Sequence, residues 1–221
     1  MCFSASASFG ASVVLAVVGV TSFACSRSLQ QRVLSGIPVI FALQQFTEGI
    51  LWMALLNPAW SHWEKPATYG FLVFAQVVWP VYVPFAMLLF EYDPLRKKII
   101  TALTIAGAVF AAYIAFCLYH YSVSAVLDTH HIRYDLGFSL AHQWYYGLLY
   151  FVPTIVAPVI SSIKKLHWLG YLFLSSYIVA RLLFHYFVIS VWCFFGAIIS
   201  IIILGMIISE KRISSRTPTV V

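Results

Sequence analysis

The residue with the clearest potential for chemistry is Glu48, a carboxylate in the middle of an apolar stretch. Gln44 and Gln45 precede it by one helical turn, and Trp52 follows one turn later. On a helix these side chains share one face, and an ionisable group within a membrane segment marks a candidate functional site. We expect this face to point into a helix bundle and to bind a small polar solute or ion. The alternative is structural, with Glu48 joining neighbouring helices by hydrogen bonds.

Arg181 is the natural partner for Glu48, because it is a cation inside another apolar stretch. Both stretches are expected to begin on the same side of the membrane, which places the two charges at similar depth. We therefore expect Arg181 to approach Glu48. His185 follows Arg181 by four residues, so a titratable imidazole lies on the same helical face. The alternative is that Arg181 and His185 cap the end of a helix.

Prolines recur in pairs within two of the apolar stretches, where they free backbone carbonyls or kink a helix. The pairs are Pro80 with Pro84 and Pro153 with Pro158. Gln76 lies about one turn before Pro80 and is a further candidate for the polar pocket. Three tyrosines are expected to bring hydroxyls to the same space: Tyr82, Tyr146 and Tyr150. The pattern favours kinked walls around a cavity.

Histidines, acids and cysteine offer a second chemistry, the binding of zinc, copper or iron. The candidate ligands are Cys2, Glu48, His120, His130, His131 and His142, with Asp128 and Asp135 nearby. Their spacing matches no established ligand pattern. Removal of Met1 would leave Cys2 with a terminal amine beside its thiol, a pair that can chelate a soft metal or act as nucleophile and base. The alternative is that Cys2 belongs to an ordinary lead-in to the first helix.

The elements that must position these groups are apolar helices. The chain is 62% hydrophobic and 9% charged, whereas a soluble domain is about half apolar and a quarter charged. Apolar stretches of membrane-spanning length recur from end to end. We predict an all-α polytopic membrane protein, a single domain over residues 1–221. About seven transmembrane helices are expected near Phe9–Cys25, Ser35–Leu56, Thr68–Leu89, Ile99–Tyr119, Tyr145–Ser162, Leu166–Phe184 and Val188–Ile208.

Charge sets the predicted orientation. The formal charge of +6 comes from short clusters between apolar stretches and makes no basic stripe, so nucleic acid is excluded as a partner. Ten of the thirteen Lys and Arg residues fall in alternate loops and at the C-terminus: Arg27, Arg32, Arg96, Lys97, Lys98, Lys164, Lys165, Lys211, Arg212 and Arg216. The positive-inside rule then places the N-terminus outside and the C-terminus in the cytoplasm. The expected location is the cell membrane, the inner membrane of a bacterium, with the lipid bilayer as partner.

The outer loop over residues 120–144 is the one long connection between the predicted helices. It mixes acids and histidines with scattered apolar residues. We expect it to fold over the outer mouth of the bundle as a short interfacial helix.

Two stretches resemble an uncharacterised family of small polytopic bacterial membrane proteins. The first is the opening Met-Cys-Phe-Ser signature, and the second is the string Gln-Gln-Phe-Thr-Glu-Gly-Ile-Leu-Trp over residues 44–52. The resemblance implies membership and supplies no activity. It falls on the terminus with Cys2 and on the helical face of Glu48, the two places where the residue types allow chemistry.

Three functions compete. The first is a carrier or channel for a small polar solute or ion, favoured by mid-membrane polar groups beside paired prolines. The second is a membrane-embedded metal- or thiol-dependent enzyme that uses Cys2, Glu48 and the outer histidines. The third is a sensor or assembly factor without turnover, and a retinal photoreceptor is excluded because residues 188–208 contain no lysine.

Overall fold

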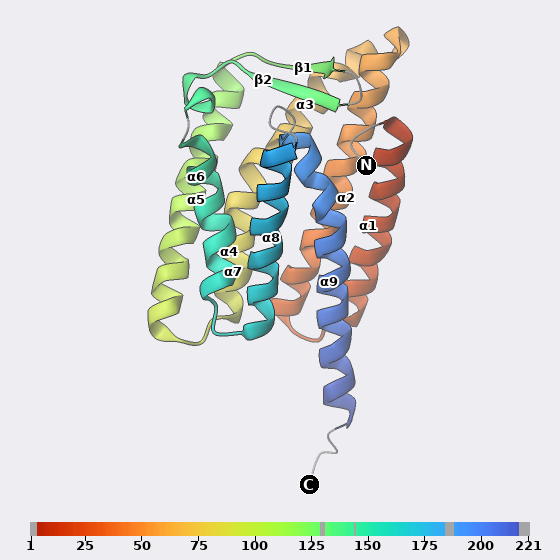
Figure 1. Ribbon diagram of the computed structural model, residues 1–221. Coiled ribbons are helices and arrows are strands. Elements are labelled where there is room, and N and C mark those ends of the chain that lie inside the picture. Colours follow the sequence, from red (N-terminus) through yellow and green to blue (C-terminus); the bar gives the residue numbers. More distant parts are fainter. Residues whose placement is uncertain (1–3, 129–130, 144, 184–187, 217–221) are drawn as a thin grey trace.

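The computed structural model is a bundle of helices that run up and down between two ends (Figure 1). The residues described are 4–128, 131–143, 145–183 and 188–216. The α-helices are α1 (Ala5–Cys25), α2 (Leu29–Leu56), α3 (Glu64–Leu72), α4 (Trp79–Phe90), α5 (Pro94–His120), α6 (Tyr146–Phe151), α7 (Ala157–Ile160), α8 (Lys164–Leu183) and α9 (Val188–Arg216). Between them lie 3₁₀-helices η1 (Pro58–Trp63) and η3 (Ser139–His142) and π-helices η2 (Val73–Val78) and η4 (Val152–Val156).

Each of the seven predicted helices overlaps a helical rod. The third rod is α3, η2 and α4 in succession, and the fifth is α6, η4 and α7. Within the part of the chain that is described, four helical segments are long and apolar enough to cross a membrane: Ala5–Cys25, Leu29–Leu56, Pro58–Phe90 and Pro94–His120. Shorter apolar helices cover Tyr146–Ile160 and Phe195–Ser209. The coarse prediction of apolar spanning helices is therefore confirmed, and the count of seven spans stays a prediction.

At one end of the bundle, polar residues in short turns cap the N-termini of the helices. Ser28 caps α2 by accepting the Gln31 backbone N–H at 3.2 Å, and Asp93 caps α5 by accepting the Arg96 N–H at 2.8 Å. Such caps satisfy N–H groups that have no partner within the helix. Because these turns are short, the rods that they join are antiparallel neighbours, and the turns lie at the lower end of Figure 1.

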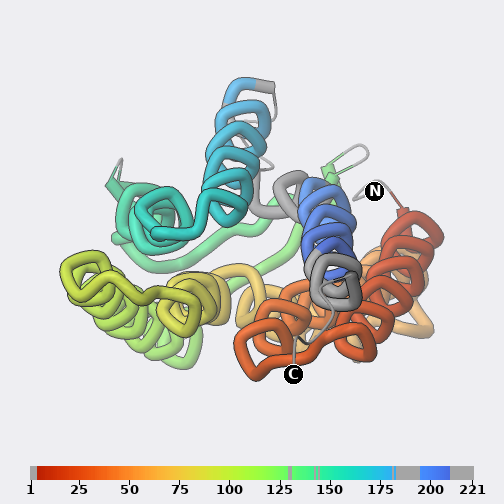
Figure 2. Tube along the Cα trace, turned by 90° about the horizontal axis from the view of Figure 1, so that it is seen from below, coloured from red at the N-terminus to blue at the C-terminus, as the bar shows by residue number. Residues whose placement is uncertain are grey.

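Seen along the helices, the rods form two layers (Figure 2). One layer contains α5, α4, α2 and α1, and the other contains α6 with α7, α8 and α9. Small buried residues on α1 let it pack closely against α2, as is common in membrane bundles. Gly19 faces Val39, and the Ser12 hydroxyl donates to the Ala42 carbonyl at 2.8 Å.

The outward faces of α1 and α5 remain apolar and exposed. Val13, Val17 and Val20 on α1 are each more than half exposed, as are Ile105 and Val109 on α5. In water, a large exposed apolar face would promote aggregation, whereas in a bilayer the lipid chains would cover it. These two helices are compatible with contact to a lipid bilayer.

The loop expected to form an interfacial helix is an antiparallel β-hairpin, so that prediction was wrong. β1 (Val123–Asp128) pairs with β2 (His131–Leu136), and both lie across one end of the bundle (Figure 1). Burial alternates strictly along β2, where Ile132, Tyr134 and Leu136 face inward. A period of two is the pattern of a half-buried strand. The Tyr134 ring stacks on Phe71 of α3 at 4.9 Å between centroids, which fixes the hairpin to the bundle.

Candidate functional site

The polar face of α2 is buried, as predicted. Gln44 and Gln45 are each 1% exposed, Glu48 is fully buried and Trp52 is 3% exposed. The Gln45 side-chain amide donates to the Glu48 carboxylate at 3.0 Å. Trp79 of α4 donates its indole N–H to the Gln44 Oε1 at 2.8 Å. We call Gln44, Gln45, Glu48 and Trp52 the α2 cluster.

Two atoms of the α2 cluster are buried without a hydrogen bond to any of the described residues. They are the Gln45 Oε1, an acceptor, and the Trp52 Nε1, a donor. The hydroxyls of Ser8 and Ser22 on α1 also have no hydrogen-bond partner among the described residues. A buried polar atom left unpaired costs about 1–3 kcal/mol, so the two that lie together in the α2 cluster need an explanation. A polar ligand that both donates and accepts hydrogen bonds would supply one.

The predicted approach of Arg181 to Glu48 stays a prediction. The backbone of Arg181 belongs to α8, but its side chain and all of His185 lie outside the described residues. Both were named as pocket residues from the sequence.

Gln76 and two of the three predicted tyrosines do come together, in the rods that contain the proline pairs. The Tyr146 hydroxyl donates to the Gln76 Oε1 at 2.8 Å, and the Tyr150 hydroxyl donates to the Ala75 carbonyl at 2.8 Å. Ala75 lies in η2, five residues before Pro80, which has no N–H to complete a π-helical hydrogen bond. The Tyr150 hydroxyl thus satisfies a carbonyl at an interrupted part of the helix.

Tyr82 serves another contact. Its hydroxyl donates to the Val33 carbonyl of α2 at 2.7 Å and occupies the space left by the missing side chain of Gly36. This hydrogen bond joins α4 to α2, so the Tyr82 hydroxyl does not bond to Gln76. The shared space predicted for all three tyrosines is therefore formed by Tyr146 and Tyr150.

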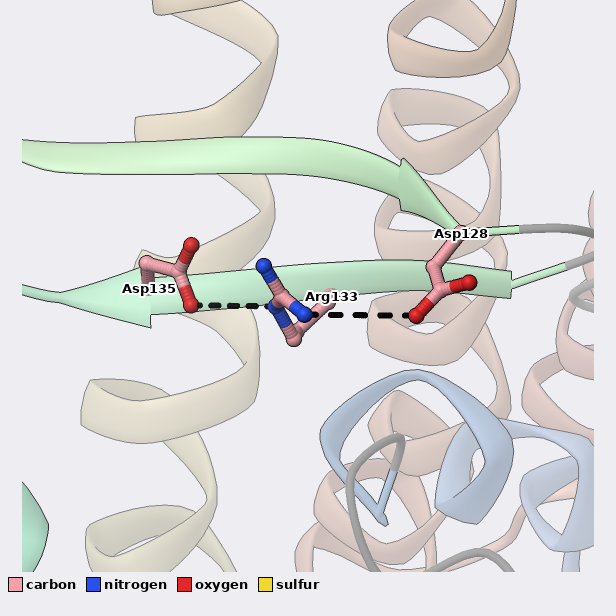
Figure 3. A network of polar contacts seen from close by, with 3 residues as sticks. All are labelled: Asp128, Arg133 and Asp135. Atoms are coloured by element: carbon pink, nitrogen blue, oxygen red, sulfur yellow. Dashed lines mark hydrogen bonds and ion pairs between the residues drawn. The ribbon is translucent and has the colours of Figure 1, made fainter.

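The acids considered as metal ligands in the outer loop lie beside an arginine of the hairpin (Figure 3). Arg133 contacts the Asp135 carboxylate at 3.2 Å and the Asp128 carboxylate at 3.9 Å. The hairpin register brings them together, since Asp128 pairs with His131 and Arg133 with Val126. All three charged side chains are near half exposed, so the ion pairs contribute at most about 1 kcal/mol.

Over the described ranges, no group of three or more His, Cys, Asp or Glu residues is placed to hold a metal ion. His120 is exposed at the end of α5, far along the chain from Glu48. Cys2, His130 and the side chain of His142 lie outside the described residues, so the metal site predicted from them stays a prediction.

Sequence reasoning missed a second buried carboxylate, Glu91, in the turn between α4 and α5. Its oxygens accept the backbone N–H groups of Tyr92 at 3.0 Å and Asp93 at 2.9 Å. They also accept the Ser162 N–H at 2.7 Å and the Ser162 hydroxyl, from the turn between α7 and α8. Burial alone would raise the pKa of Glu91, but these hydrogen bonds outweigh it and the pKa lies below its ordinary value.

The same two turns are joined by a second contact. The Arg96 guanidinium donates to the carbonyls of Ile160 and Ser161 at 3.0 Å each, which satisfies acceptors at the end of α7. The His167 ring also contacts the Ser161 carbonyl. We call this arrangement the turn latch. Its one sequence signal was an acid directly after an apolar helix, and nothing in the sequence pointed to Ser162 as the partner.

A family model described as "Family of unknown function (DUF6629)" matches residues 1–218. No curated protein and no solved structure matches the chain.

Proposed function

The chain belongs to this family of unknown function, DUF6629, and we propose that it is a multi-pass membrane protein that binds a small polar solute at the α2 cluster and moves it across the membrane. The observation that carries the proposal is the pair of buried atoms, Gln45 Oε1 and Trp52 Nε1, that no described residue satisfies. The Gln45 Oε1 requires a hydrogen-bond donor, and the Trp52 Nε1–H requires an acceptor.

The chemistry of the cluster narrows the solute. Glu48 and the Gln45 Oε1 attract a donor or a positive group, and the Trp52 N–H attracts an acceptor. Arg181 and His185, if they approach as predicted, add a cation on the acceptor side. A compact neutral or zwitterionic molecule with both kinds of group fits better than a bare metal cation.

The proposed path of the solute runs along the two rods that a π-helix interrupts, α3–η2–α4 and α6–η4–α7. The π-helices η2 and η4 lie in two rods that are joined by the Tyr150 hydroxyl of α6, which donates to the Ala75 carbonyl of η2. Broken helices near the membrane midplane are the usual walls of solute sites in transporters. We assign Gln76 to the same path because Tyr146 already orients its side chain.

The proposal includes seven spans with the N-terminus outside and the C-terminus inside. Arg27, Arg96 and Lys164 stand at turns of the same end of the bundle, which supports this orientation. The bilayer would then cover the apolar faces of α1 and α5. The α2 cluster would lie in the outer half, since α2 begins at the basic end and Glu48 follows near the other.

The test is solute uptake by protein reconstituted in liposomes, with glycine, glycerol and urea as separate probes. We expect at least one probe to enter faster than in protein-free liposomes. Glu48→Gln and Trp52→Phe should reduce that rate about tenfold or more, because each removes a hydrogen bond worth roughly 1.5–3 kcal/mol to a buried solute. Arg181→Gln tests the predicted cation in the same assay.

Glu64→Gln is the matched control, since Glu64 lies in the first turn of α3 and outside the α2 cluster. Each variant is first checked for the wild-type helix content by circular dichroism. Equal permeability of wild-type and protein-free liposomes to all three probes would overturn the proposal. So would equal loss of uptake in Glu48→Gln and Glu64→Gln.

A further inference from the structure

Ser8 of α1 carries a buried hydroxyl that no described residue satisfies, on the helix that packs against the α2 cluster. The Ser8 backbone N–H donates to the Ser4 carbonyl at 3.1 Å. A serine or threonine hydroxyl inside a helix often donates to the same carbonyl, four residues earlier. Thr21 on α1 and Thr47 on α2 do so. Ser8 is an exception, so its hydroxyl needs a partner from elsewhere.

Two contacts between α1 and α2 fix the level of Ser8 in the bundle (Figure 1). Ser12, one turn later on α1, donates its hydroxyl to the Ala42 carbonyl at 2.8 Å. The Phe9 ring covers Gly49, where an added β-carbon would meet the ring at 2.7 Å. Because the two helices are antiparallel, Ser8 lies against the stretch of α2 between these contact points. That stretch contains the first three residues of the α2 cluster.

The Gln45 amide offers the complementary group at this level. Its Nε2 donates to the Glu48 carboxylate at 3.0 Å, which fixes Oε1 as the acceptor that is left without a donor. A flipped amide would place Oε1 against the carboxylate oxygens and lose that hydrogen bond. The Ser8 hydroxyl and the Gln45 Oε1 thus come from facing helices and do not bond to each other. A group that lies between them can bond to both.

The chemistry of that group follows from the two residues. It must accept a hydrogen bond from Ser8 and donate one to the Gln45 Oε1. A hydroxyl does both through one oxygen, whereas an amide divides the two roles between its oxygen and its nitrogen. The sequence of α1 contains no charged residue, so this side of the site offers no ion pair to a charged solute.

We infer that Ser8 is a further binding residue of the α2 cluster and that the solute is a small polyol. The Ser8 hydroxyl donates to one hydroxyl of the polyol, which in turn donates to the Gln45 Oε1. A second hydroxyl of the polyol accepts the Trp52 indole N–H, the other unsatisfied group of the cluster. The inference rests on the proposed function and narrows its solute to one chemical class.

The first test compares Ser8→Ala with Ser22→Ala in the liposome assay, with glycerol and urea as probes. Ser22 is the matched control, because it is also a fully buried serine of α1 whose hydroxyl bonds to no described residue. It lies about four turns from Ser8, roughly 21 Å along the helix. Ser8→Ala should lower glycerol uptake about fivefold, the change that corresponds to about 1 kcal/mol for a neutral hydrogen bond, and should affect urea less. Ser22→Ala should change neither rate.

Three outcomes of this test count against the inference. Wild-type glycerol uptake that Ser8→Ala leaves unchanged would overturn it, assign the Ser8 hydroxyl to a buried water molecule and leave the proposed function in place. An equal loss in Ser8→Ala and Ser22→Ala would overturn it in favour of a packing role for both serines. An equal loss of glycerol and urea uptake in Ser8→Ala would overturn the polyol assignment.

A second measurement does not depend on transport. Ser8→Cys and Ser22→Cys, each in a cysteine-free background, are treated with methanethiosulfonate ethylammonium, and the modified fraction is measured by intact mass. Both positions are fully buried, so burial alone predicts equally slow reactions. We expect Ser8→Cys to react faster, and glycerol but not the same concentration of glycine to slow its reaction.

Equal rates for the two cysteines, or equal slowing by glycerol and glycine, would overturn the inference. If the wild type takes up none of the probes while glycerol protects Ser8→Cys as expected, the proposed transport is rejected and Ser8 remains a binding residue for a polyol.

Discussion

At the residue scale, the protein uses two buried carboxylates for different purposes. Glu48 lies within α2 and accepts a side-chain amide from Gln45. Glu91 lies just beyond α4 and accepts four hydrogen bonds, two of them from Ser162. Glu91 has a structural role, since its oxygens accept hydrogen bonds that join two turns. Glu48 lies beside Gln45 and Trp52, which each retain a buried polar atom without a hydrogen bond, as the residues of a binding site do.

Glu91→Gln should destabilise the protein by about 1–3 kcal/mol, because an amide nitrogen would face the N–H donors that the carboxylate now accepts. The measurement is thermal unfolding in detergent at pH 7. Glu64→Gln serves as control and should change the melting temperature little. A Glu91→Gln protein as stable as wild type would show that the turn latch contributes nothing to the fold.

The lowered pKa of Glu91 predicts how this stabilisation depends on pH. A carboxyl whose pKa is lower in the folded state stabilises the fold fully above the unfolded value, near 4.5, and loses this contribution as pH falls through the folded value. The difference in melting temperature between wild type and Glu91→Gln should therefore be constant from pH 7 to about pH 5 and shrink below that. A difference that grows on acidification would contradict the assignment.

At the scale of elements, the two interrupted rods show how proline shapes the bundle. In each rod a π-helix ends two residues before a proline, at Val78 before Pro80 and at Val156 before Pro158. The widened turns leave carbonyls that neighbouring side chains and helices can approach. Gly107 of α5 contacts the Pro80 carbonyl where a side chain would not fit.

Gly107→Ala should therefore destabilise the protein, by about 1–3 kcal/mol, because the added methyl group would run into the Pro80 carbonyl. Gly10→Ala and Gly205→Ala are controls with open space around the new methyl group, and each should be neutral or stabilising by up to about 1 kcal/mol. Chemical unfolding of the three variants in detergent makes the comparison. An equal loss of unfolding free energy in all three variants would show that the effect comes from replacing any helical glycine and not from the contact with Pro80.

The elements were predictable where one periodic signal dominated. The lengths of the apolar stretches located the helical rods. Helical spacing alone predicted that Gln44, Glu48 and Trp52 share a buried face. The outer loop was misassigned because the alternation in residues 131–136 is short and was outweighed by its mixed composition. The bond between Glu91 and Ser162 joins residues 71 positions apart, and local pattern carries no signal for such a contact.

At the scale of the whole molecule, the bundle is polarised from end to end. Short basic turns and the first turns of α2, α5 and α8 occupy one end, and the hairpin with its Arg133 ion pairs covers the other (Figures 1 and 3). Such asymmetry is what directs a chain into a membrane in one orientation.

Orientation can be tested in intact cells with a cysteine-free background. A single cysteine introduced by Ser124→Cys on the outward face of the hairpin should react with a membrane-impermeant maleimide added outside. A cysteine introduced by Lys97→Cys in the first turn of α5 should react only after the membrane is permeabilised. The reverse pattern would contradict the N-out, C-in proposal.

The turn latch also constrains how the protein is made. When α4 and α5 emerge from the ribosome, Glu91 can bond to Tyr92 and Asp93, but Ser162 is still 71 residues away from synthesis. During that interval the carboxylate lacks the two donors of Ser162, and water has to take their place. Both contacts of the turn latch need residues 160–162, so neither can close before the fifth rod has been synthesised.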